Sequence, residues 1–508
     1  MTTRDPLIVA LDIGTGSVRA HLMDPNGEIF KTGGRPVNVV VAPDGRAEVD
    51  TEKIWRSLCQ CVPEILAGTA SSRIVAVGLA SALGYLFLDE KGTPLTPALL
   101  WMDRRAPAEA ALLASKIDEG RLYEITGRRL DPEIFLAKLL WLRRYEPEIF
   151  SRASCFLGIK DDVIRRLTGI IGSDPTHASY TMLYDVSRRR WSDELLGLTE
   201  IPPRLLPEIR RADQVAGKVS REGSTATGLP QGVPVVTGAS DGTVGCLAAG
   251  IAESGTVVNV TGTSDVLMTA VPHPLMDPQR RALLNPHPVS DCWMVGGVMG
   301  TTGGALKWFV ENFCPDLTGT DRYAILDREA GKEGVGARGL MALTGLSGER
   351  APLWNPAARG VFFGLDLSHG RGDLARAILE SVALSVKEMV EVMKQTGAQV
   401  RTLQVVGGGA GSDLWNQIRA DATGLPVARP KLTEGTATGI LILTGLGIGL
   451  FTDLAEAARK IAPVGKIYQP NPENRSFYDR LAGLRRDLHA SLQDPFTRLA
   501  EFRKGFST

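Results

Sequence analysis

The chain has 508 residues, of which 44% are hydrophobic and 22% charged, values typical of a globular enzyme with more than one domain. Lys and Arg together number 57, as do Asp and Glu, so no global field attracts the protein to nucleic acid or to an anionic membrane. The six cysteines form no CxxC pair and no zinc pattern, which favours a reducing compartment with each thiol as a small buried hydrophobe. The N-terminal residues lack the features of a signal peptide, so we expect a cytoplasmic protein without a membrane segment.

The chain opens on two predicted strands joined by a tight turn. The apolar run Leu7–Leu11 leads into Asp12-Ile-Gly-Thr-Gly-Ser, and a second extended segment follows at Val18–Met23. We expect these two strands to pair antiparallel. Two further strands and two helices with apolar spacing come next, at Ile74–Leu79, Leu86–Asp89, Ala106–Ile117 and Leu136–Tyr145.

The opening pattern returns past the middle of the chain. The strand Thr256–Val260 leads into Thr261-Gly-Thr-Ser-Asp, and Val266–Met268 continues as a second strand. Gly14-Thr15 and Gly262-Thr263 therefore occupy equivalent points of two strand–turn–strand units. One such unit near the start of each half predicts duplicated α/β domains that face each other.

The second half then alternates helix, strand and helix. The strand Leu403–Val406 runs into Gly407–Gly411, and a helix starts near Ser412. We place the domain boundary at Gly242–Ile251, which gives a first domain of residues 1–245 and a second of residues 246–508. The long helix before that strand is predicted from an N-cap at Asp373 to Gly397, with an apolar stripe of Ile378, Val382, Val386, Met389 and Met393.

Two common phosphate-binding motifs are excluded. A Walker A loop needs Ser or Thr after its Gly-Lys, but Lys218, Lys332 and Lys466 are followed by Val, Glu and Ile. A GxGxxG occurs at Gly334–Gly339, yet it precedes the strand-like Leu340–Leu343 instead of following a strand. It is interpreted as a loop.

The turn at Asp12 is a better candidate for a phosphate site. An acidic side chain that leaves a buried strand can hold a metal ion or its water, and Gly14 lets the backbone approach a phosphate closely. Thr15 and Ser17 offer hydroxyl groups, and Arg19 can pair with phosphate oxygens. A hairpin with an Asx turn would explain this motif equally well if it stood alone. The companion turn in the second half favours phosphate, because two Gly-Thr turns can clamp one polyphosphate between domains.

The segment Ala10–Ala20, which contains this turn, looks like the first phosphate motif of the FGGY carbohydrate kinases, a family that includes glycerol kinase, xylulokinase and gluconokinase. Gly360–Glu380 fits the family's C-terminal signature at every constrained position. The N-terminal signature is present only in part: Lys138–Leu142 matches, whereas Glu133 and Phe135 depart from it. The resemblance implies an α/β protein with two ribonuclease-H-like domains of the actin-like ATPase type and a cleft between them.

The resemblance also implies MgATP as the phosphate donor and assigns roles to single residues. Asp241, after an apolar strand, would be the catalytic base, although on its local sequence alone it could be a helix cap. Asp12, together with Asp241, would place Mg²⁺. The glycine-rich segment after Val406 resembles the adenosine motif, and its expected nucleotide contacts are Gly408, Gly409, Ser412 and Asn416.

On the acceptor side, Trp101-Met-Asp103 matches the family's Trp-x-Asp motif. Asp103 can accept hydrogen bonds from sugar hydroxyls, and Trp101 offers a flat wall for C–H faces. Xylulokinases have a segment similar to Gln-Met-His at the position where this chain has Ser81-Ala82-Leu83. Ser81 is the expected substrate contact of this segment. The Ser-Ala pair resembles gluconokinase-type members. Arg104 and Arg105 are interpreted as a charge run near a helix start, and His177, His273 and His287 as loop or surface residues.

Together these features predict an ATP-dependent carbohydrate kinase of the xylulokinase/gluconokinase branch, which phosphorylates a hydroxyl of a small sugar or polyol. D-xylulose is placed ahead of gluconate, and tetritols and modified sugars are placed behind both. The alternative class is an actin-like ATPase or regulatory protein, which would not need Trp101, Asp103 and Asp241. The family habit implies a homodimer, and neither a nucleic acid nor a membrane partner is expected.

Overall fold

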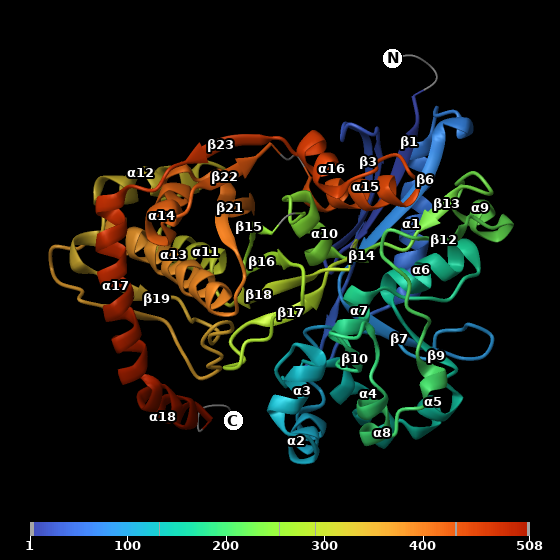
Figure 1. The fold of residues 1–508 in the computed structure, drawn as a ribbon, viewed down its shortest axis with the longest axis horizontal. Helices are drawn as coiled ribbons and strands as arrows, with labels where there is room; N and C mark the ends of the chain where they lie inside the picture. The colour runs from blue at the N-terminus through green and yellow to red at the C-terminus, as the bar shows by residue number, and fades with distance from the viewer. Residues whose placement is uncertain (1–4, 132, 253, 290, 432–433, 505–508) are drawn as a thin grey trace.

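The computed structural model describes residues 5–504 except 132, 253, 290, 432 and 433. Two large mixed sheets, one in each half of the chain, form the centres of two α/β lobes (Figure 1). In the N-terminal half, the seven-stranded sheet has the order β12-β13-β6-β1-β2-β3, with β14 paired to β6. Its strands are β1 Leu7–Ile13, β2 Ser17–Met23, β3 Ile29–Pro36, β6 Ile74–Ser81, β12 Val215–Lys218, β13 Pro234–Val236 and β14 Ala239–Ser240.

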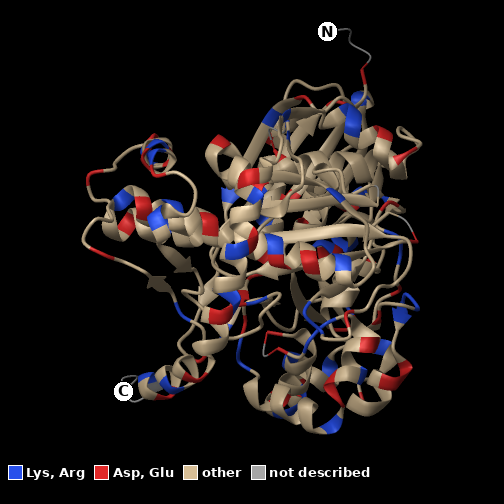
Figure 2. Cartoon of the chain, turned by 60° about the vertical axis from the view of Figure 1, so that its left-hand side comes forward, with Lys and Arg blue, Asp and Glu red and all other residues tan. Residues whose placement is uncertain are grey.

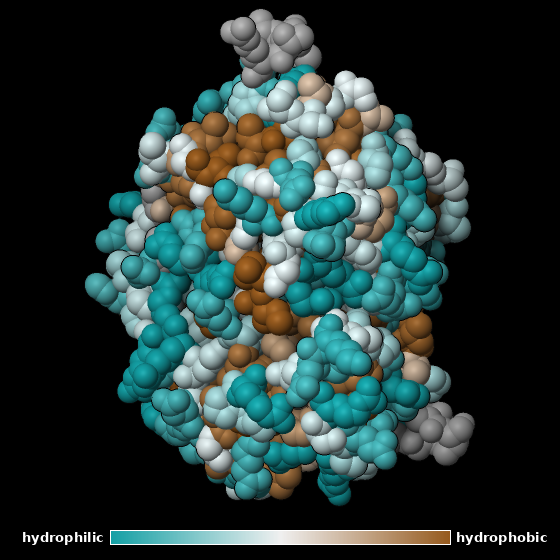
Figure 3. Space-filling model, turned by 90° about the vertical axis from the view of Figure 1, so that its right-hand side faces the viewer, coloured by the Kyte–Doolittle hydropathy of each residue, from teal (hydrophilic) through white to brown (hydrophobic). Residues whose placement is uncertain are grey.

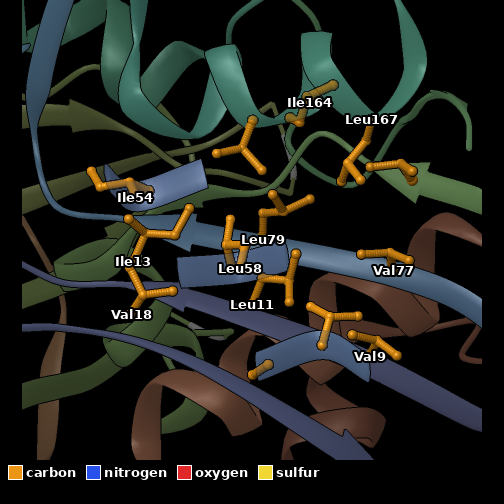
Figure 4. Packing of buried hydrophobic residues seen from close by; sticks show 14 of the residues in the cluster. Val9, Leu11, Ile13, Val18, Ile54, Leu58, Val77, Leu79, Ile164 and Leu167 are labelled. Carbon is orange, nitrogen blue, oxygen red and sulfur yellow. The ribbon is translucent and has the colours of Figure 1, made fainter. Parts of the chain in front are cut away.

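Strand β1 forms the centre of this sheet and is buried on both faces. Its residues Val9, Leu11 and Ile13 pack toward the helices α1 (Thr51–Leu66) and α6 (Ile159–Thr168), as the close view of the core shows (Figure 4). The alternate residues Ile8 and Ala10 belong to a second apolar cluster together with residues of helix α15 (Gly435–Gly447). A strand that is covered on both faces requires a continuous apolar sequence, and Leu7–Leu11 provides one.

A smaller sheet and several helices extend the N-terminal half and carry the acceptor-side residues. This sheet has the order β4-β5-β8-β7-β9. Its strands are β4 Val40–Val41, β5 Ala47–Val49, β7 Gly84–Leu88, β8 Ala98–Leu100 and β9 Cys155–Gly158. The surrounding elements are α2 Pro107–Lys116, α3 Glu119–Thr126, α4 Phe135–Tyr145, α5 Pro147–Arg152, α7 Pro175–Tyr180, β10 Tyr184–Asp185, β11 Arg190–Trp191, α8 Asp193–Thr199 and α9 Arg221–Thr227.

The C-terminal half repeats the plan of the first. Its seven-stranded sheet has the order β17-β18-β16-β15-β21-β22-β23. The strands are β15 Gly255–Thr261, β16 Asp265–Val271, β17 Leu283–Pro286, β18 Trp293–Met299, β21 Val400–Gly407, β22 Val427–Pro430 and β23 Val464–Tyr468, with β19 Met341–Leu343 and β20 Val361–Phe363 as a separate pair. The helices are α10 Asp241–Ala248, α11 Gly303–Phe313, α12 Arg322–Lys332, α13 Arg371–Gln395, α14 Asp413–Thr423, α15 Gly435–Gly447, α16 Leu454–Ile461, α17 Pro472–Ser491 and α18 Gln493–Lys504.

The predicted duplication is visible in the strand pairing. β1 pairs antiparallel with β2 and parallel with β6, and β15 pairs in the same way with β16 and β21. Helices α10 and α15 lie between the two sheets in Figure 1, and their apolar residues share one cluster with residues of both β1 and β15. The two lobes are therefore joined by packed helices and not only by the chain.

The structure confirms the predicted strands and helices to within a few residues, with two corrections. Helix α13 has its N-cap at Gly370, and Asp373 is the third helical residue, whose carboxylate accepts the Gly370 N–H at 2.8 Å. The prediction that each cysteine is buried is wrong for Cys59 and Cys292, which are partly exposed. None of the six cysteines, all of which lie among the described residues, forms a disulfide bond.

The surface carries both signs of charge. Lys and Arg residues are interspersed with Asp and Glu residues over the helices (Figure 2), in line with the equal totals in the sequence. One face is mostly hydrophilic with separate apolar areas (Figure 3). Within the part of the chain that the structure describes, no helix is long and apolar enough to cross a lipid bilayer.

Candidate functional site

The register of the N-terminal sheet brings the two predicted catalytic aspartates to one edge. Asp12 pairs with Ala80 across β1 and β6, and Ser240 pairs with Ser81 across β14 and β6. Because β1 and β14 both run parallel to β6, their carboxyl ends meet at the same edge of the sheet. Asp241 follows Ser240 directly, as the first residue of α10. This edge is the usual position of a ligand site in an open α/β sheet.

The two carboxylates interact electrostatically. Burial, and next the negative charge of Asp241, raise the pKa of Asp12 to about 6, while Arg19 acts in the opposite direction. Burial also raises the pKa of Asp241, although the Gly242 N–H and His177 counteract part of this effect. The Gly242 N–H donates to Asp241 Oδ1 at 2.7 Å, so one carboxylate oxygen is held and the other is left for a ligand.

These residues fit a hard divalent cation. Two carboxylates that repel each other in a partly buried site provide oxygen ligands and a negative field, both of which Mg²⁺ prefers. Among the described residues, no cluster of three or more acidic, His or Cys side chains could ligate a metal. A bound Mg²⁺ would therefore take its remaining ligands from water and phosphate, as is usual for this ion.

The two Gly-Thr turns differ in their surroundings. In the first turn, the Gly14 N–H donates to the Ser17 carbonyl at 2.9 Å, and Thr15 and Ser17 are partly exposed. In the second, Gly262 and Thr263 are exposed. Arg19 is also exposed; its guanidinium lies 3.7 Å from Glu434 of the C-terminal half. The phosphate contacts of these five residues remain predictions.

A helix N-terminus beside Thr263 was missed in the sequence. The Thr302 and Gly304 N–H groups each donate to the Thr263 carbonyl at 3.1 Å, at the start of α11. A Cβ on Gly303 would lie 2.3 Å from the Gly262 carbonyl oxygen, so only glycine permits this close approach. The Thr302 and Gly304 N–H groups are thereby occupied, so the start of α11 holds the second Gly-Thr turn in place instead of offering these groups to a phosphate. The run Gly300-Thr-Thr-Gly-Gly was the available signal.

The predicted adenosine motif is a short 3₁₀ turn over Gly408–Gly411. The Gly409 N–H donates to Thr261 Oγ1 at 3.0 Å, which ties this turn to the end of β15. Ser412 caps α14 by accepting the Trp415 N–H. Asn416 is fully buried and donates to the Ala410 carbonyl at 2.9 Å, so it supports the turn from behind. Contacts of this turn with a nucleotide remain predictions.

On the acceptor side, Trp101 is 40% exposed and is held by its backbone. Its N–H donates to the Leu83 carbonyl at 3.0 Å. The buried Lys138 ammonium donates to the Leu100 carbonyl at 2.7 Å. Burial lowers the pKa of Lys138 to about 8, against the opposing charge of Asp103. Lys138 therefore acts as a structural support of the Trp101 segment.

Asp103 has all of its carboxylate oxygens occupied within the protein. It is fully buried, accepts the Ala47 N–H at 2.7 Å and pairs with the Arg105 guanidinium at 2.7 Å. Arg104 and Arg105 lie just before α2, in line with the predicted charge run near a helix start. Arg104 is exposed, whereas the Arg105 side chain is 7% exposed and also pairs with Glu48. A direct contact between Asp103 and an acceptor remains a prediction.

The prediction that the histidines are loop or surface residues is correct for His273, which is exposed, and for His287, which lies in a loop after β17, but it is wrong for His177, which lies in α7. His177 and His287 are both buried, at 0% and 1% exposure. His287 Nε2 bonds to the Ile251 carbonyl at 3.0 Å. His177 Nε2 lies 3.3 Å from the hydroxyl oxygen of Ser81, which is itself fully buried. A direct acceptor contact of Ser81 remains a prediction, and His177 is the acceptor-side residue that sequence reasoning missed.

Comparisons with solved structures agree with this two-lobed arrangement. The xylulose kinase of Rhodospirillum rubrum superposes with a TM-score of 0.90 at 30% identity, covering 97% of this chain and 100% of that one. The gluconate kinase of Lactobacillus acidophilus gives a TM-score of 0.91 at 25% identity, with the same coverage. The fold is therefore that of the actin-like ATPases, as predicted.

Sequence comparisons point to the same family. An autoinducer-2 kinase of Yersinia enterocolitica is 31% identical over 495 residues, 94% of this chain and 93% of the relative. One from an Enterobacter species is 30% identical over 488 residues. Residues 7–248 match the N-terminal domain of the FGGY family of carbohydrate kinases, and residues 257–448 match its C-terminal domain. With these matches along nearly its whole length, the chain belongs to the FGGY family of carbohydrate kinases.

Proposed function

We propose that this carbohydrate kinase transfers the γ-phosphate of MgATP to a hydroxyl group of a small polyhydroxylated acceptor, with Asp241 as the catalytic base. The observation that carries the proposal is the meeting of Asp12 and Asp241 at one sheet edge, at the join of the two halves. A phosphotransferase needs a cation on the phosphates and a base at the acceptor hydroxyl, and this pair can serve both needs.

In the proposed reaction, the protein positions the phosphates and moves one proton. Thr15, Ser17 and Thr263 would hold the phosphate oxygens. Mg²⁺ near Asp12 would neutralise charge on the transferred group. The free oxygen of Asp241 would accept the proton of the acceptor hydroxyl, and burial makes this carboxylate a stronger base by raising its pKa.

Three acceptors have specific support. Autoinducer-2 stands first, because the similar curated sequences carry the name autoinducer-2 kinase. In addition, Ser81-Ala82-Leu83 differs from the Gln-Met-His segment expected of a xylulokinase. D-xylulose stands second, on the likeness to the R. rubrum xylulose kinase. Gluconate follows on the likeness to the L. acidophilus enzyme.

The test is a coupled assay of ADP release with MgATP and, in turn, autoinducer-2, D-xylulose, gluconate, erythritol or no acceptor. We expect one acceptor to raise the rate well above the acceptor-free background. Asp241→Asn should lower kcat for that acceptor by about 10²–10⁴-fold, the usual contribution of a positioned base. An ATP turnover that no acceptor changes, and that Asp241→Asn leaves intact, would instead support the actin-like ATPase or regulatory class.

A further inference from the structure

A buried polar cluster lies against the strand ends that carry the site. Asp174, Thr176 and His177, at the start of α7, are each at most 2% exposed, and Lys160 of α6 is fully buried beside them. Burial of so many polar groups is costly unless each one is paired. Two chains of hydrogen bonds lead from Asp174 in this cluster to the strand ends that carry the site.

The first branch leads to the residue before Asp241. The Asp174 carboxylate can only accept hydrogen bonds, so the Thr176 hydroxyl donates to Asp174 Oδ1, at 2.5 Å. This orientation leaves a lone pair of the Thr176 oxygen free, and it accepts the Ser240 N–H at 3.0 Å. Asp241 follows Ser240 directly, as the first residue of α10.

The second branch leads to the neighbouring strand. His177 Nδ1 lies 2.8 Å from Asp174 Oδ2, and His177 Nε2 lies 3.3 Å from Ser81 Oγ. The Tyr85 hydroxyl donates to the His177 carbonyl at 2.6 Å and so anchors the histidine from the other side. Ser81 and Ser240 are partners across β6 and β14. The two branches therefore hold the paired last residues of two adjacent strands.

Asp174 is kept in its ionised, accepting form by its neighbours. The Lys160 ammonium lies 3.0 Å from Asp174 Oδ2 and also pairs with Asp161. Burial alone would raise the pKa of Asp174, but Lys160 and His177 outweigh it and hold that pKa well below its usual range. Asp161 is in turn fixed by the Gly158 N–H at 3.1 Å and the Ser173 hydroxyl at 2.6 Å.

We propose that Asp174, Thr176 and His177 form a clamp that positions the catalytic base, by fixing the ends of β6 and β14 at the point where Asp241 leaves the sheet. The proposal rests on the proposed role of Asp241. These three are positioning residues, since none of them reaches the transferred phosphate in the proposed reaction. A displacement of a reacting group by about 1 Å can lower a rate about 100-fold, so we expect loss of the clamp to lower the rate of phosphoryl transfer strongly.

Thr176→Val tests the first branch, because valine has the same shape but cannot accept the Ser240 N–H. With MgATP and the fastest acceptor among autoinducer-2, D-xylulose and gluconate, we expect kcat to fall about 10- to 100-fold while the KM for ATP changes less than about twofold. Thr176→Ser keeps the hydroxyl and should restore kcat to within about threefold of the wild type. His177→Phe, which keeps a planar ring but loses both hydrogen bonds, tests the second branch and should also lower kcat.

Thr181→Val is the matched control. Thr181 is a threonine on the same segment, 1% exposed, whose hydroxyl donates to the Ala178 carbonyl and does not reach β14. It should keep kcat near the wild-type value. The clamp is overturned if Thr176→Val retains full kcat while Asp241→Asn is inactive, if Thr176→Val and Thr181→Val lose kcat equally, or if His177→Phe has no effect. Retention of turnover by Asp241→Asn would instead overturn the proposed function.

Discussion

Asp12 is a residue at which the needs of binding and of stability conflict. Its pKa of about 6 in the folded protein exceeds the ordinary value of 3.8, so the protein binds this proton more tightly when it is folded. The stability that the protonated form provides is complete below about pH 4 and is lost as the pH rises through 6. At neutral pH, the ionised Asp12 therefore destabilises the protein in the absence of a cation.

We predict that Asp12→Asn raises the free energy of unfolding at pH 7.5 by about 1–2 kcal/mol in metal-free buffer. Two pKa units represent about 3 kcal/mol, and the partial exposure of Asp12 reduces this value. Urea denaturation at several pH values measures this gain in stability, which should disappear near pH 4. The same substitution should abolish phosphoryl transfer. Asp316→Asn is the control, since Arg371 lowers the pKa of Asp316 and no gain is expected. A gain equal at pH 4 and pH 7.5 would contradict the prediction.

At the scale of elements, the contact between α10 and α15 controls how Asp241 is held. A Cβ on Gly439 of α15 would lie 2.1 Å from the Val244 carbonyl oxygen of α10, whereas Gly435 of the same helix has no atom within 4 Å of such a Cβ. Gly→Ala in a helix normally stabilises by up to about 1 kcal/mol. We predict that Gly439→Ala instead lowers the free energy of unfolding by about 1–3 kcal/mol.

Gly439→Ala should also lower kcat, because α10 begins at Asp241 and a shifted α10 moves the carboxylate. Chemical denaturation and the ADP-release assay measure the two effects on the same preparation. Gly435→Ala is the matched control on α15 and should be neutral or stabilising. If both substitutions stabilise the protein, the close packing of the two helices has no energetic consequence.

The elements on the phosphate side could be predicted from the sequence because their signals are local. The apolar run before Asp12 specifies a buried strand, and Gly14 in a short turn between two strands specifies the turn. The side-chain contacts on the acceptor side could not be predicted in this way, because they join residues that are far apart in the sequence. Ser81 and His177, for example, are separated by 96 positions. Asp373 shows the same limit on a smaller scale. Asp is common at both N-cap and N3 positions, so its residue type alone does not fix the start of α13.

At the scale of the whole molecule, one ion pair crosses between the lobes beside the acceptor side. Arg350, between β19 and β20, donates to Glu133 of the N-terminal half at 2.5 Å, and its guanidinium lies 5.9 Å from the centre of the Trp101 ring. Arg104 bonds to the other oxygen of Glu133 at 2.9 Å, but within the N-terminal half. Glu133 departs from the family signature, and the structure gives it a role as the shared partner of both arginines.

Arg350 therefore links the two lobes beside Trp101 through its bond to Glu133. We predict that Arg350→Gln raises the acceptor KM about fivefold, which corresponds to about 1 kcal/mol for a partly buried ion pair. Steady-state kinetics over a range of acceptor concentrations measures the change. Arg104→Gln removes a bond to the same carboxylate without crossing between the lobes, so it should leave the acceptor KM nearly unchanged. Equal effects of both substitutions would mean that Glu133 serves only the local fold of the N-terminal half.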